Sequence, residues 1–583
     1  MRLTNVLDQS NQHGDDGSKP CIVLAQEGST ASFTLTYSAA SLARNDHLEW
    51  LRQHTTPSTT AGTSMEGNIL IAYLASNSTD MLLSILASTE ISNAGVALLN
   101  TRWTTIEIVN VLQSHSLTDK TLILHDGDSQ HTAQQVAKVL HHPVDVVLIP
   151  TISVHYIIST ITDTNRNQFQ LLPRITPPFN ADHEIKSMLQ KHQNDNDDDA
   201  LIVFTSGTTS GSKGVRLSHT AILIQALAKC GPPCHCSTHT QLLATVPFFH
   251  VGGLSSALAV WLTGGTLVMP PAKGFKASFV VEAMTSQVTN TLVVVPAMLH
   301  AILQHLDHQQ PTTMFSFFTI DLILIGGQSA SPTMVQQLKT TFPKARLVQT
   351  YACTEAASSL TFSLLSDKIA IESNGDCVGY PPSHIDLCLV QQPCSEGQII
   401  PIHEDRTVGI FATKGHHVMN GYWNNRNNEH HNFSTLRRNE WFLTNDLGFK
   451  VNGQFYFCGR TKDVIRTGGE TVIAAEVERI LLECHDIMDC AVFALPDDQF
   501  GEVVCAALVL KRDRHQQQRL QQPVVTLSQI RQFCGVKGLA NYKRPRRLFH
   551  VKELPRNSSG KVLKFMLVDT FGSKQGNDIQ SKL

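Results

Sequence analysis

The chain has few charged residues and almost no excess of charge of either sign. Asp, Glu, Lys and Arg make up 16% of its 583 residues, and the formal net charge is −3. Nucleic-acid-binding and membrane-surface proteins usually carry a basic excess, which provides the electrostatic attraction to phosphate groups. The composition therefore gives no reason to expect nucleic acid or an anionic membrane as a partner.

The sequence also lacks the long apolar run that a membrane helix or a secretory leader needs. Residues 1–20 are polar and resemble neither a signal peptide nor an Arg-rich transit peptide. Residues 240–272 contain no Asp, Glu, Lys or Arg, but glycine or proline pairs interrupt them at 252–253, 264–265 and 270–271. Spanning a bilayer takes about 20 consecutive apolar residues. We expect a short buried helix and a strand here, and no membrane span.

Thirteen cysteines occur without a secretory signal. That combination indicates free thiols in a reducing compartment rather than a disulfide framework. One cluster combines cysteines with histidines: Cys230, Cys234, His235, Cys236 and His239. Adjacent ligands and an intervening proline pair fit the spacing of a tetrahedral zinc site poorly. We expect a loop after a helix, and metal binding there stays open.

The most informative segment is a loop made only of hydroxyl residues, glycines and one lysine. Residues 205–214 read T-S-G-T-T-S-G-S-K-G and follow an apolar run at 200–203 that predicts a buried strand. Backbone N–H groups, hydroxyls and a lysine can hold phosphate oxygens, and glycines let the backbone approach them. The P-loop pattern fails, because Gly211 is followed by Ser212 and Lys213 by Gly214. A polar linker would explain the composition, but not the strand before it or the helix predicted at 220–227.

This loop resembles the phosphate-binding signature T-S-G-T-T-G-x-P-K-G of the adenylate-forming superfamily, with Ser210 and Ser212 replacing a glycine and the proline. The superfamily includes acyl-CoA synthetases, luciferases and peptide-synthetase adenylation domains. Four further segments resemble its motifs in the same order: Y-A-C-T-E at 351–355, T-N-D at 444–446, G-R-T-K-D-V-I-R-T-G-G-E at 459–470 and P-R-N-S-S-G-K at 555–561. Ala352 and Asn445 stand where the motifs have glycine. Because five motifs occur in register, the chain is identified as a member of this superfamily.

The resemblance implies a role for each matching residue, with ATP, Mg²⁺ and coenzyme A as the ligands. The catalytic residues would be Lys561, Glu355, Thr205, Lys213 and His250. The residues binding ATP and CoA would be Thr205, Ser206, Gly207, Thr208, Thr209, Lys213, Tyr351, Thr354, Asp446, Arg460, Lys462, Arg466, Gly468 and Gly469. Glu355 would hold Mg²⁺, since that ion takes hard oxygen ligands beside nucleotide phosphates.

The implied reaction has two steps. A carboxylate attacks the α-phosphate of ATP to give an acyl-adenylate and pyrophosphate, and the thiol of CoA then attacks the adenylate carbonyl. Lys561 would supply positive charge in the first step, and a small domain would rotate about Lys462 between the steps. Tyr351 would stack on adenine, Asp446 would accept hydrogen bonds from the ribose hydroxyls, and Gly468 and Gly469 would line the pantetheine tunnel.

The acid substrate is predicted from segments outside the ATP motifs. Residues 246–257 and 351–362 resemble the 2-succinylbenzoate–CoA ligase branch, especially its plant and algal members, which act on the way to phylloquinone or menaquinone. A dianionic aromatic acid needs an apolar wall, a flat surface and a donor for its second carboxylate. The candidates are Phe248, Phe249, His250, Gly326, Gly327, Gln328 and Ser329, with Ser331 as a further donor. Core packing explains Phe248 and Phe249 equally well.

Three other functions remain open. The first is a 4-coumarate-like or medium-chain acyl-CoA synthetase, which shares the same chemistry. The second is a luciferase-type enzyme that oxidises its adenylate, and the third is an inactive scaffold. Glu355, Asp446, Arg460 and Lys561 are all present, which argues against the scaffold.

The fold is predicted to be α/β. Short apolar runs such as 121–124, 146–150, 291–295 and 321–325 alternate with amphipathic stretches, which indicates parallel sheets covered by helices. A shift in composition follows Arg460. We therefore expect a large N-terminal domain of layered α/β subdomains at 1–460 and a small, mobile α+β domain at 461–583.

The last three residues are Ser581, Lys582 and Leu583. A C-terminal S-K-L is a peroxisomal import signal, and the polar residues before it suit an accessible tail. We expect the peroxisomal import receptor as a partner and the peroxisome as the location.

Overall fold

The computed structural model describes residues 20–24, 32–55, 69–91, 94–113, 120–140, 143–149, 158–160, 181–191, 199–205, 212–270, 274–286, 288–308, 320–365, 377–391, 399–423, 440–511, 525–556 and 562–572. The chain divides into two compact units, one of residues 1–387 and 413–442 and the other of residues 388–412 and 443–583. This division groups residues 443–460 with the C-terminal part, so the location of a moving boundary after Arg460 stays a prediction.

A seven-stranded sheet carries the predicted phosphate loop. Its strand order is β19-β9-β8-β4-β3-β5-β6. The strands are β3 (Ile69–Leu74), β4 (Ala94–Leu98), β5 (Lys120–His125), β6 (Val144–Leu148), β8 (Asp199–Thr205), β9 (Lys213–Ser218) and β19 (Gly421–Tyr422). Strands β3, β4, β5, β6 and β8 are parallel, and β9 returns antiparallel to β8. The apolar runs at 121–124 and 200–203 lie in β5 and β8, as predicted, and the first three residues of the run at 146–150 lie in β6.

A nine-stranded sheet carries the predicted acid-binding segments. Its order is β15-β14-β13-β12-β10-β11-β1-β2-β7. The strands are β1 (Pro20–Leu24), β2 (Ser32–Thr36), β7 (Ile158–Thr160), β10 (Gln241–Leu243), β11 (Thr266–Met269), β12 (Thr291–Val294), β13 (Leu322–Ile325), β14 (Arg346–Cys353) and β15 (Ser358–Leu364). Strands β10, β12, β13 and β14 run parallel in adjacent positions. Their carboxyl ends therefore meet at one edge of the sheet, where parallel α/β sheets bind ligands.

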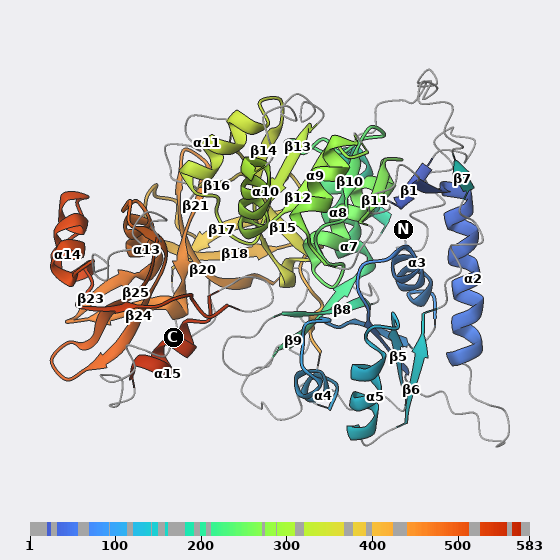
Figure 1. The fold of residues 1–583 in the computed structure, drawn as a ribbon, viewed down its shortest axis with the longest axis horizontal. Coiled ribbons are helices and arrows are strands. Elements are labelled where there is room, and N and C mark those ends of the chain that lie inside the picture. Colours follow the sequence, from blue (N-terminus) through green and yellow to red (C-terminus); the bar gives the residue numbers. More distant parts are fainter. Residues whose placement is uncertain are drawn as a thin grey trace. The chain divides into compact units, whose positions relative to one another are not determined.

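Helices cover these two sheets (Figure 1). They are α2 (Tyr37–Thr55), α3 (Thr79–Ser88), α4 (Thr105–Gln113), α5 (Gln130–Val139), α6 (Ala181–Lys191), α7 (His219–Ala228), α8 (Val251–Leu262), α9 (Ala277–Thr285), α10 (Pro296–His308) and α11 (Pro332–Thr341). Every residue of α7 is buried, and α8 packs beside it. A helix that is apolar all round belongs in a core.

The described part of the charge-free segment, residues 240–270, contains the predicted helix, α8, and the predicted strand, β11, together with a strand that was not predicted, β10. Its helix has 12 residues, far fewer than a bilayer requires. Among the described residues, no helix is long and apolar enough to cross a membrane.

The second unit contains mostly antiparallel sheet. Strands β17 (Asp386–Val390), β18 (Gly409–Lys414), β20 (Phe442–Val451) and β21 (Gln454–Arg460) belong to one sheet. The other has the order β23-β22-β25-β24, with β26 beside β25. Its elements are β22 (Val464–Thr467), β23 (Glu470–Ile473), α13 (Ala474–Leu482), β24 (Ile487–Asp497), β25 (Gly501–Leu510), α14 (Leu527–Val536), β26 (Arg547–His550) and α15 (Lys564–Gly572). These elements confirm the predicted α+β fold of the C-terminal part.

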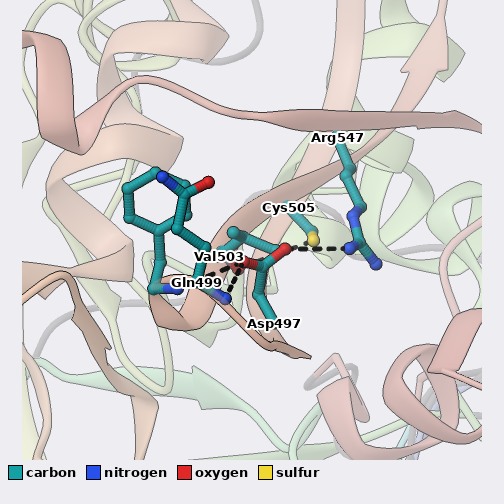
Figure 2. A network of polar contacts seen from close by, with 6 residues as sticks. Asp497, Gln499, Val503, Cys505 and Arg547 are labelled. Carbon is teal, nitrogen blue, oxygen red and sulfur yellow. Dashed lines mark hydrogen bonds and ion pairs between the residues drawn. The ribbon is translucent and has the colours of Figure 1, made fainter.

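A polar network fixes the turn between β24 and β25, as Figure 2 shows. The Asp497 carboxylate accepts hydrogen bonds from the backbone N–H groups of Gln499 (3.1 Å) and Phe500 (3.2 Å). Its other oxygen pairs with the guanidinium of Arg547 at 3.2 Å. The turn matters for the predicted CoA-binding segment, because the carbonyl of Phe500 accepts a hydrogen bond from Gly468.

Candidate functional site

The phosphate loop begins and ends on two paired strands. Thr205 is the last residue of β8 and Lys213 the first of β9, and the two are partners in the antiparallel ladder. The loop is therefore closed at its base by Thr205 and Lys213. Four of the predicted phosphate-binding residues lie outside the described residues: Ser206, Gly207, Thr208 and Thr209.

Lys213 is exposed, and its ammonium lies over the ring of Tyr422, 5.0 Å from the centroid. The next residue, Gly214, leaves no room for a side chain. A Cβ there would lie 3.1 Å from Phe204 and 3.2 Å from Trp423. The glycine thus lets β19 pack closely against β9, and this packing places Tyr422 beside Lys213.

The second motif forms a tight turn between β14 and β15. Tyr351 is buried within β14, and Thr354 and Glu355 lie in a single 3₁₀ turn, Thr354–Ala356. Ala357 then adopts a left-handed conformation with φ of 56° and reverses the chain into β15. The carboxyl end of β14 therefore presents Tyr351, Thr354 and Glu355 at one edge of the nine-stranded sheet.

Tyr422 connects the first two motifs. Its hydroxyl donates a hydrogen bond to Oε1 of Glu355 at 3.0 Å, while its ring faces Lys213. Burial, and secondly the Glu355 carboxylate, raise the pKa of Tyr422, so the hydroxyl stays protonated and remains a donor. In addition, the backbone N–H of Met419 donates to the Glu355 carbonyl at 2.8 Å. The side chain of Tyr422 thus contacts both the predicted phosphate-binding lysine, Lys213, and the predicted metal-binding carboxylate, Glu355.

Sequence analysis did not single out Tyr422. It lies 67 residues after Glu355 and in no motif, so only the pairing of β19 with β9 reveals its position. A two-residue strand has no periodic pattern that a sequence could display.

The predicted aromatic wall lies at the beginning of α8. Phe248 and Phe249 are 1% and 5% exposed and belong to the main apolar core of the first unit. The side chain of Asn77 fixes this segment by accepting from the Phe248 N–H (2.8 Å) and donating to the Val246 carbonyl (2.9 Å). Core packing accounts for the burial of both phenylalanines, and a role in acid binding remains a prediction for them.

His250 is the N-cap residue of α8, and its ring lies 4.7 Å from that of Phe249. Burial and, secondly, the positive charge of Arg102 lower the pKa of His250 to about 4. The imidazole is therefore neutral near pH 7. It can serve there as a hydrogen-bonding group, but not as a positive charge.

The glycine segment follows β13 at the same edge of the sheet. Gly327 has a φ of 81°, a conformation that residues with side chains rarely adopt. Gln328 and Ser329 are exposed. Since β13 pairs in parallel with β14, this segment and the Tyr351 motif leave neighbouring strand ends. The structure therefore places the glycine segment, which we predicted to contact the acid, beside the motif that we predicted to bind ATP.

In the second unit, Asp446 and Arg460 are partners on the antiparallel strands β20 and β21. They form an ion pair, with Arg460 Nε 3.2 Å from Oδ1 of Asp446. Asn445 stands where the family motif has glycine and has a φ of 60°. Asparagine tolerates this left-handed region better than other residues with side chains. The substitution is therefore compatible with the left-handed backbone conformation that precedes Asp446 in β20.

The hinge segment continues from Arg460. Lys462 is exposed in the 3₁₀ turn Thr461–Asp463. Partial burial is the main factor that lowers its pKa, and the carboxylate of Asp463 opposes this effect.

The predicted CoA-binding residues lie on the next hairpin. Gly468 and Gly469 have φ values of 58° and 82° and form the two-residue turn between β22 and β23. Two successive positive φ angles are typical of such a turn. Arg466 is exposed and donates a hydrogen bond to the hydroxyl of Thr471.

Two predicted features lie outside the described residues: Lys561 and the tail residues Ser581, Lys582 and Leu583. The segment that contains Lys561 is closed by a bridge between Arg556 and Val562 and by a hydrogen bond from the Leu563 N–H to the Pro555 carbonyl.

The cysteine cluster lies in the core. Cys230 and Cys234 are buried, and burial raises the pKa of both thiols. Among the described residues, no group of three His, Cys, Asp or Glu side chains is arranged to hold a metal ion.

Comparisons with known proteins agree with this arrangement. Residues 62–423 match the family model for AMP-binding enzymes, and residues 476–561 match the model for the AMP-binding enzyme C-terminal domain. The chain is 32% identical to a chloroplastic/peroxisomal 2-succinylbenzoate–CoA ligase of Arabidopsis thaliana over 63% of its own length and 66% of that protein. It is 28% identical to an oxalate–CoA ligase of Arabidopsis thaliana over 65% of its own length and 68% of that protein. The matches thus span about two thirds of these relatives.

The fold is also that of a solved structure, an o-succinylbenzoate CoA synthetase from Bacillus subtilis in complex with its acyl-adenylate intermediate. The TM-score is 0.70, with 22% sequence identity and 97% of both chains covered. Because the first family model matches more than half of the chain, this protein belongs to the AMP-binding enzyme family.

Proposed function

We propose that this protein is an ATP-dependent ligase that joins a carboxylic acid to coenzyme A, and that the acid is 2-succinylbenzoate. The observation that carries the ligase proposal is the pairing of Lys213 and Glu355 through Tyr422, since it joins a phosphate-binding lysine to a metal-binding carboxylate. The 2-succinylbenzoate proposal is supported by the 32% identity to the Arabidopsis ligase for that acid.

The residues fit a magnesium ion bound with ATP. Glu355 is partly exposed, and Tyr422 is bonded to its Oε1. Among the described residues, no donor is bonded to Oε2. Mg²⁺ is usually bound by one or two carboxylates together with substrate phosphates, and it would neutralise phosphate charge at this site.

In the first step, an oxygen of the acid forms a bond to the α-phosphorus of ATP as the bond to pyrophosphate breaks. Thr205, Lys213 and the loop between them hold the phosphates, and Lys561 offsets the charge that develops on the α-phosphate. Tyr351 packs on the adenine, and Asp446 accepts hydrogen bonds from the ribose.

In the second step, the CoA sulfur loses its proton and forms a bond to the acyl carbonyl carbon, and AMP leaves. Between the two steps, the C-terminal domain rotates about Lys462. This rotation removes Lys561 from the active site and brings in the hairpin of Gly468 and Gly469. The thioester forms because AMP is a good leaving group, whereas a free carboxylate has none.

We also propose that the protein is imported into peroxisomes by recognition of Ser581, Lys582 and Leu583. The name of the Arabidopsis relative includes the peroxisome, which supports this location.

The acid is tested by ATP–pyrophosphate exchange with 2-succinylbenzoate, 4-coumarate and octanoate. We expect 2-succinylbenzoate to give the highest kcat/KM. A higher kcat/KM for 4-coumarate or octanoate would assign the protein to another branch of acyl-CoA synthetases. It would not affect the assignment to the AMP-binding enzyme family.

Replacing Lys561 with alanine is expected to reduce adenylate formation by about 100-fold or more, as when a donor to a developing negative charge is lost. Thioester formation from preformed adenylate should be nearly unchanged, because Lys561 has left the site by then. The exposed Lys552 provides a control, Lys552→Ala, that removes a positive charge nearby in the sequence. Equal loss of both half-reactions in Lys561→Ala would argue against domain rotation.

Replacing Tyr422 with phenylalanine removes the hydroxyl that orients Glu355. Loss of such a supporting hydrogen bond typically weakens metal binding by about 10- to 100-fold. We therefore expect the Mg²⁺ concentration for half-maximal adenylation to rise by about tenfold. Tyr380→Phe is a matched control, because Tyr380 is 52% exposed in the same unit. An unchanged Mg²⁺ dependence would show that Tyr422 does not support a metal ligand.

Removing residues 581–583 from a fluorescent fusion is expected to move the protein from peroxisomes to the cytosol, because the receptor reads the free C-terminal tripeptide. Fluorescence microscopy of cells with a peroxisomal marker measures this. Retention of the truncated fusion in peroxisomes would contradict the proposed signal.

A further inference from the structure

A lysine that belongs to none of the predicted motifs is buried in the core of the first unit. Lys229 follows directly after helix α7 and is only 2% exposed. Lysines are almost never fully buried unless they are paired, since moving an ammonium out of water costs several kcal/mol. A buried lysine therefore needs a specific explanation.

Within the described ranges, every hydrogen-bond partner of this ammonium is neutral. Nζ of Lys229 donates to the Gln225 carbonyl (3.2 Å), to Oγ of Ser255 (2.9 Å) and to Oγ of Ser358 (3.1 Å). In the part of the chain that the structure describes, no carboxylate lies within ion-pairing distance of Nζ. The carbonyl at the end of α7 offers only the partial negative charge of a helix terminus.

The charge of Lys229 is retained near neutral pH. Burial lowers its pKa to about 8, so the amine is still mostly protonated at pH 7. The neighbouring thiols of Cys230, Cys234 and Cys236 have pKa values raised chiefly by burial and do not supply a negative charge. Among the described residues, no anion thus compensates the positive charge of Lys229 in the core.

The position of Lys229 connects the two segments, 246–257 and 351–362, that resemble the 2-succinylbenzoate–CoA ligase branch. Ser255 lies on α8, five residues after His250, and Ser358 begins β15, three residues after Glu355. One turn before Lys229, the Gln225 amide donates to the Ala356 carbonyl at 2.9 Å. The ammonium therefore lies where α7, α8 and the turn after Glu355 meet.

We propose that Lys229, whose ammonium is held by the hydroxyl oxygens of Ser255 and Ser358, binds the second carboxylate of a dicarboxylic acid, the one that is not joined to AMP. This inference rests on the proposed ligase function and names the class of acid that it selects. The three N–H groups of the ammonium are bonded to neutral acceptors, so the carboxylate replaces one of these acceptors and supplies the negative charge that no described residue provides. A monocarboxylic acid leaves the ammonium uncompensated and is therefore a poorer substrate.

The two serines are suited to this role. Ser255 donates its own proton to the Val251 carbonyl at 2.5 Å, and the two hydroxyl oxygens lie 3.1 Å apart. When the lysine is replaced by an apolar residue, the serines keep each other as partners. Lys229→Met is therefore expected to leave the fold intact.

The test compares 2-succinylbenzoate with 4-oxo-4-phenylbutanoate, which is the same molecule without the ring carboxylate. Pyrophosphate release gives kcat/KM for adenylation by the full-length protein. We expect Lys229→Met to lower kcat/KM for 2-succinylbenzoate by about 100-fold, mainly through KM, as for loss of one partner of a buried charge pair. The value for 4-oxo-4-phenylbutanoate should stay within about threefold of wild type, as expected where no pair is broken. Equal changes for both acids, or no change, would overturn the inference.

Two serine variants provide a matched pair that keeps the lysine. Ser255→Ala removes a partner of Lys229 and is expected to lower kcat/KM for 2-succinylbenzoate alone, by about tenfold. Ser256→Ala removes the neighbouring buried hydroxyl, which bonds only to the Gly252 carbonyl at 2.6 Å among the described residues. This control should leave the ratio between the two acids unchanged. If Lys229→Met does not fold, Ser255→Ala and Ser256→Ala provide the test. An equal effect of these two variants on kcat/KM for 2-succinylbenzoate overturns the inference.

The wild-type protein separates this inference from the proposed substrate. If it does not activate 2-succinylbenzoate but prefers another dicarboxylate, such as oxalate, the substrate proposal fails, and the same variants are tested with that acid and its monocarboxylate analogue. If the wild-type protein prefers a monocarboxylate, the role of Lys229 is refuted even though the ligase function stands.

Discussion

The structure depends on one constraint, the reversal of the chain between β14 and β15. Strand β14 must end and turn back within the four residues Thr354 to Ala357, and the left-handed Ala357 makes this possible. Contacts from distant segments fix the turn: Gln225 binds the Ala356 carbonyl, Met419 binds the Glu355 carbonyl and Tyr422 binds the Glu355 carboxylate. The orientation of Glu355 is therefore set by the whole first unit rather than by its own motif.

The same turn relates the nucleotide chemistry to the choice of acid. On one side, Tyr422 connects Glu355 to the phosphate loop through Lys213. On the other side, Ser358 connects β15 to the buried ammonium of Lys229. Parallel strands β10, β12, β13 and β14 end at this edge, so residues far apart in the sequence converge there without a long connecting loop.

Sequence reasoning predicted the elements whose pattern is local. The buried strands β5, β8, β12 and β13, the helix α7 and the α+β fold of the C-terminal part all followed from apolar runs and their spacing. The motifs also identified Thr205, Glu355 and Asp446, which the structure places at the end of β8, in the turn after β14 and within β20. The roles of these residues, and the domain boundary after Arg460, stay predictions.

Residues whose importance depends on tertiary contacts were missed. Tyr422 lies 67 residues from Glu355, and Lys229 lies 129 residues from Ser358. A lysine at the end of an apolar helix looks like an exposed cap, because sequence alone does not reveal that α8 and β15 enclose it. Asn445 seemed a departure from the family, but its left-handed conformation explains why asparagine can replace glycine there.

The most direct measurement is a crystal structure of the full-length protein with a sulfamoyl analogue of the 2-succinylbenzoyl adenylate. We predict that Nζ of Lys229 and Oγ of Ser358 lie within hydrogen-bond distance, about 2.7 to 3.2 Å, of the carboxylate that is not joined to adenosine. A structure in which this carboxylate binds Gln328 or Ser329 instead, while Lys229 keeps only its neutral partners, would contradict the account.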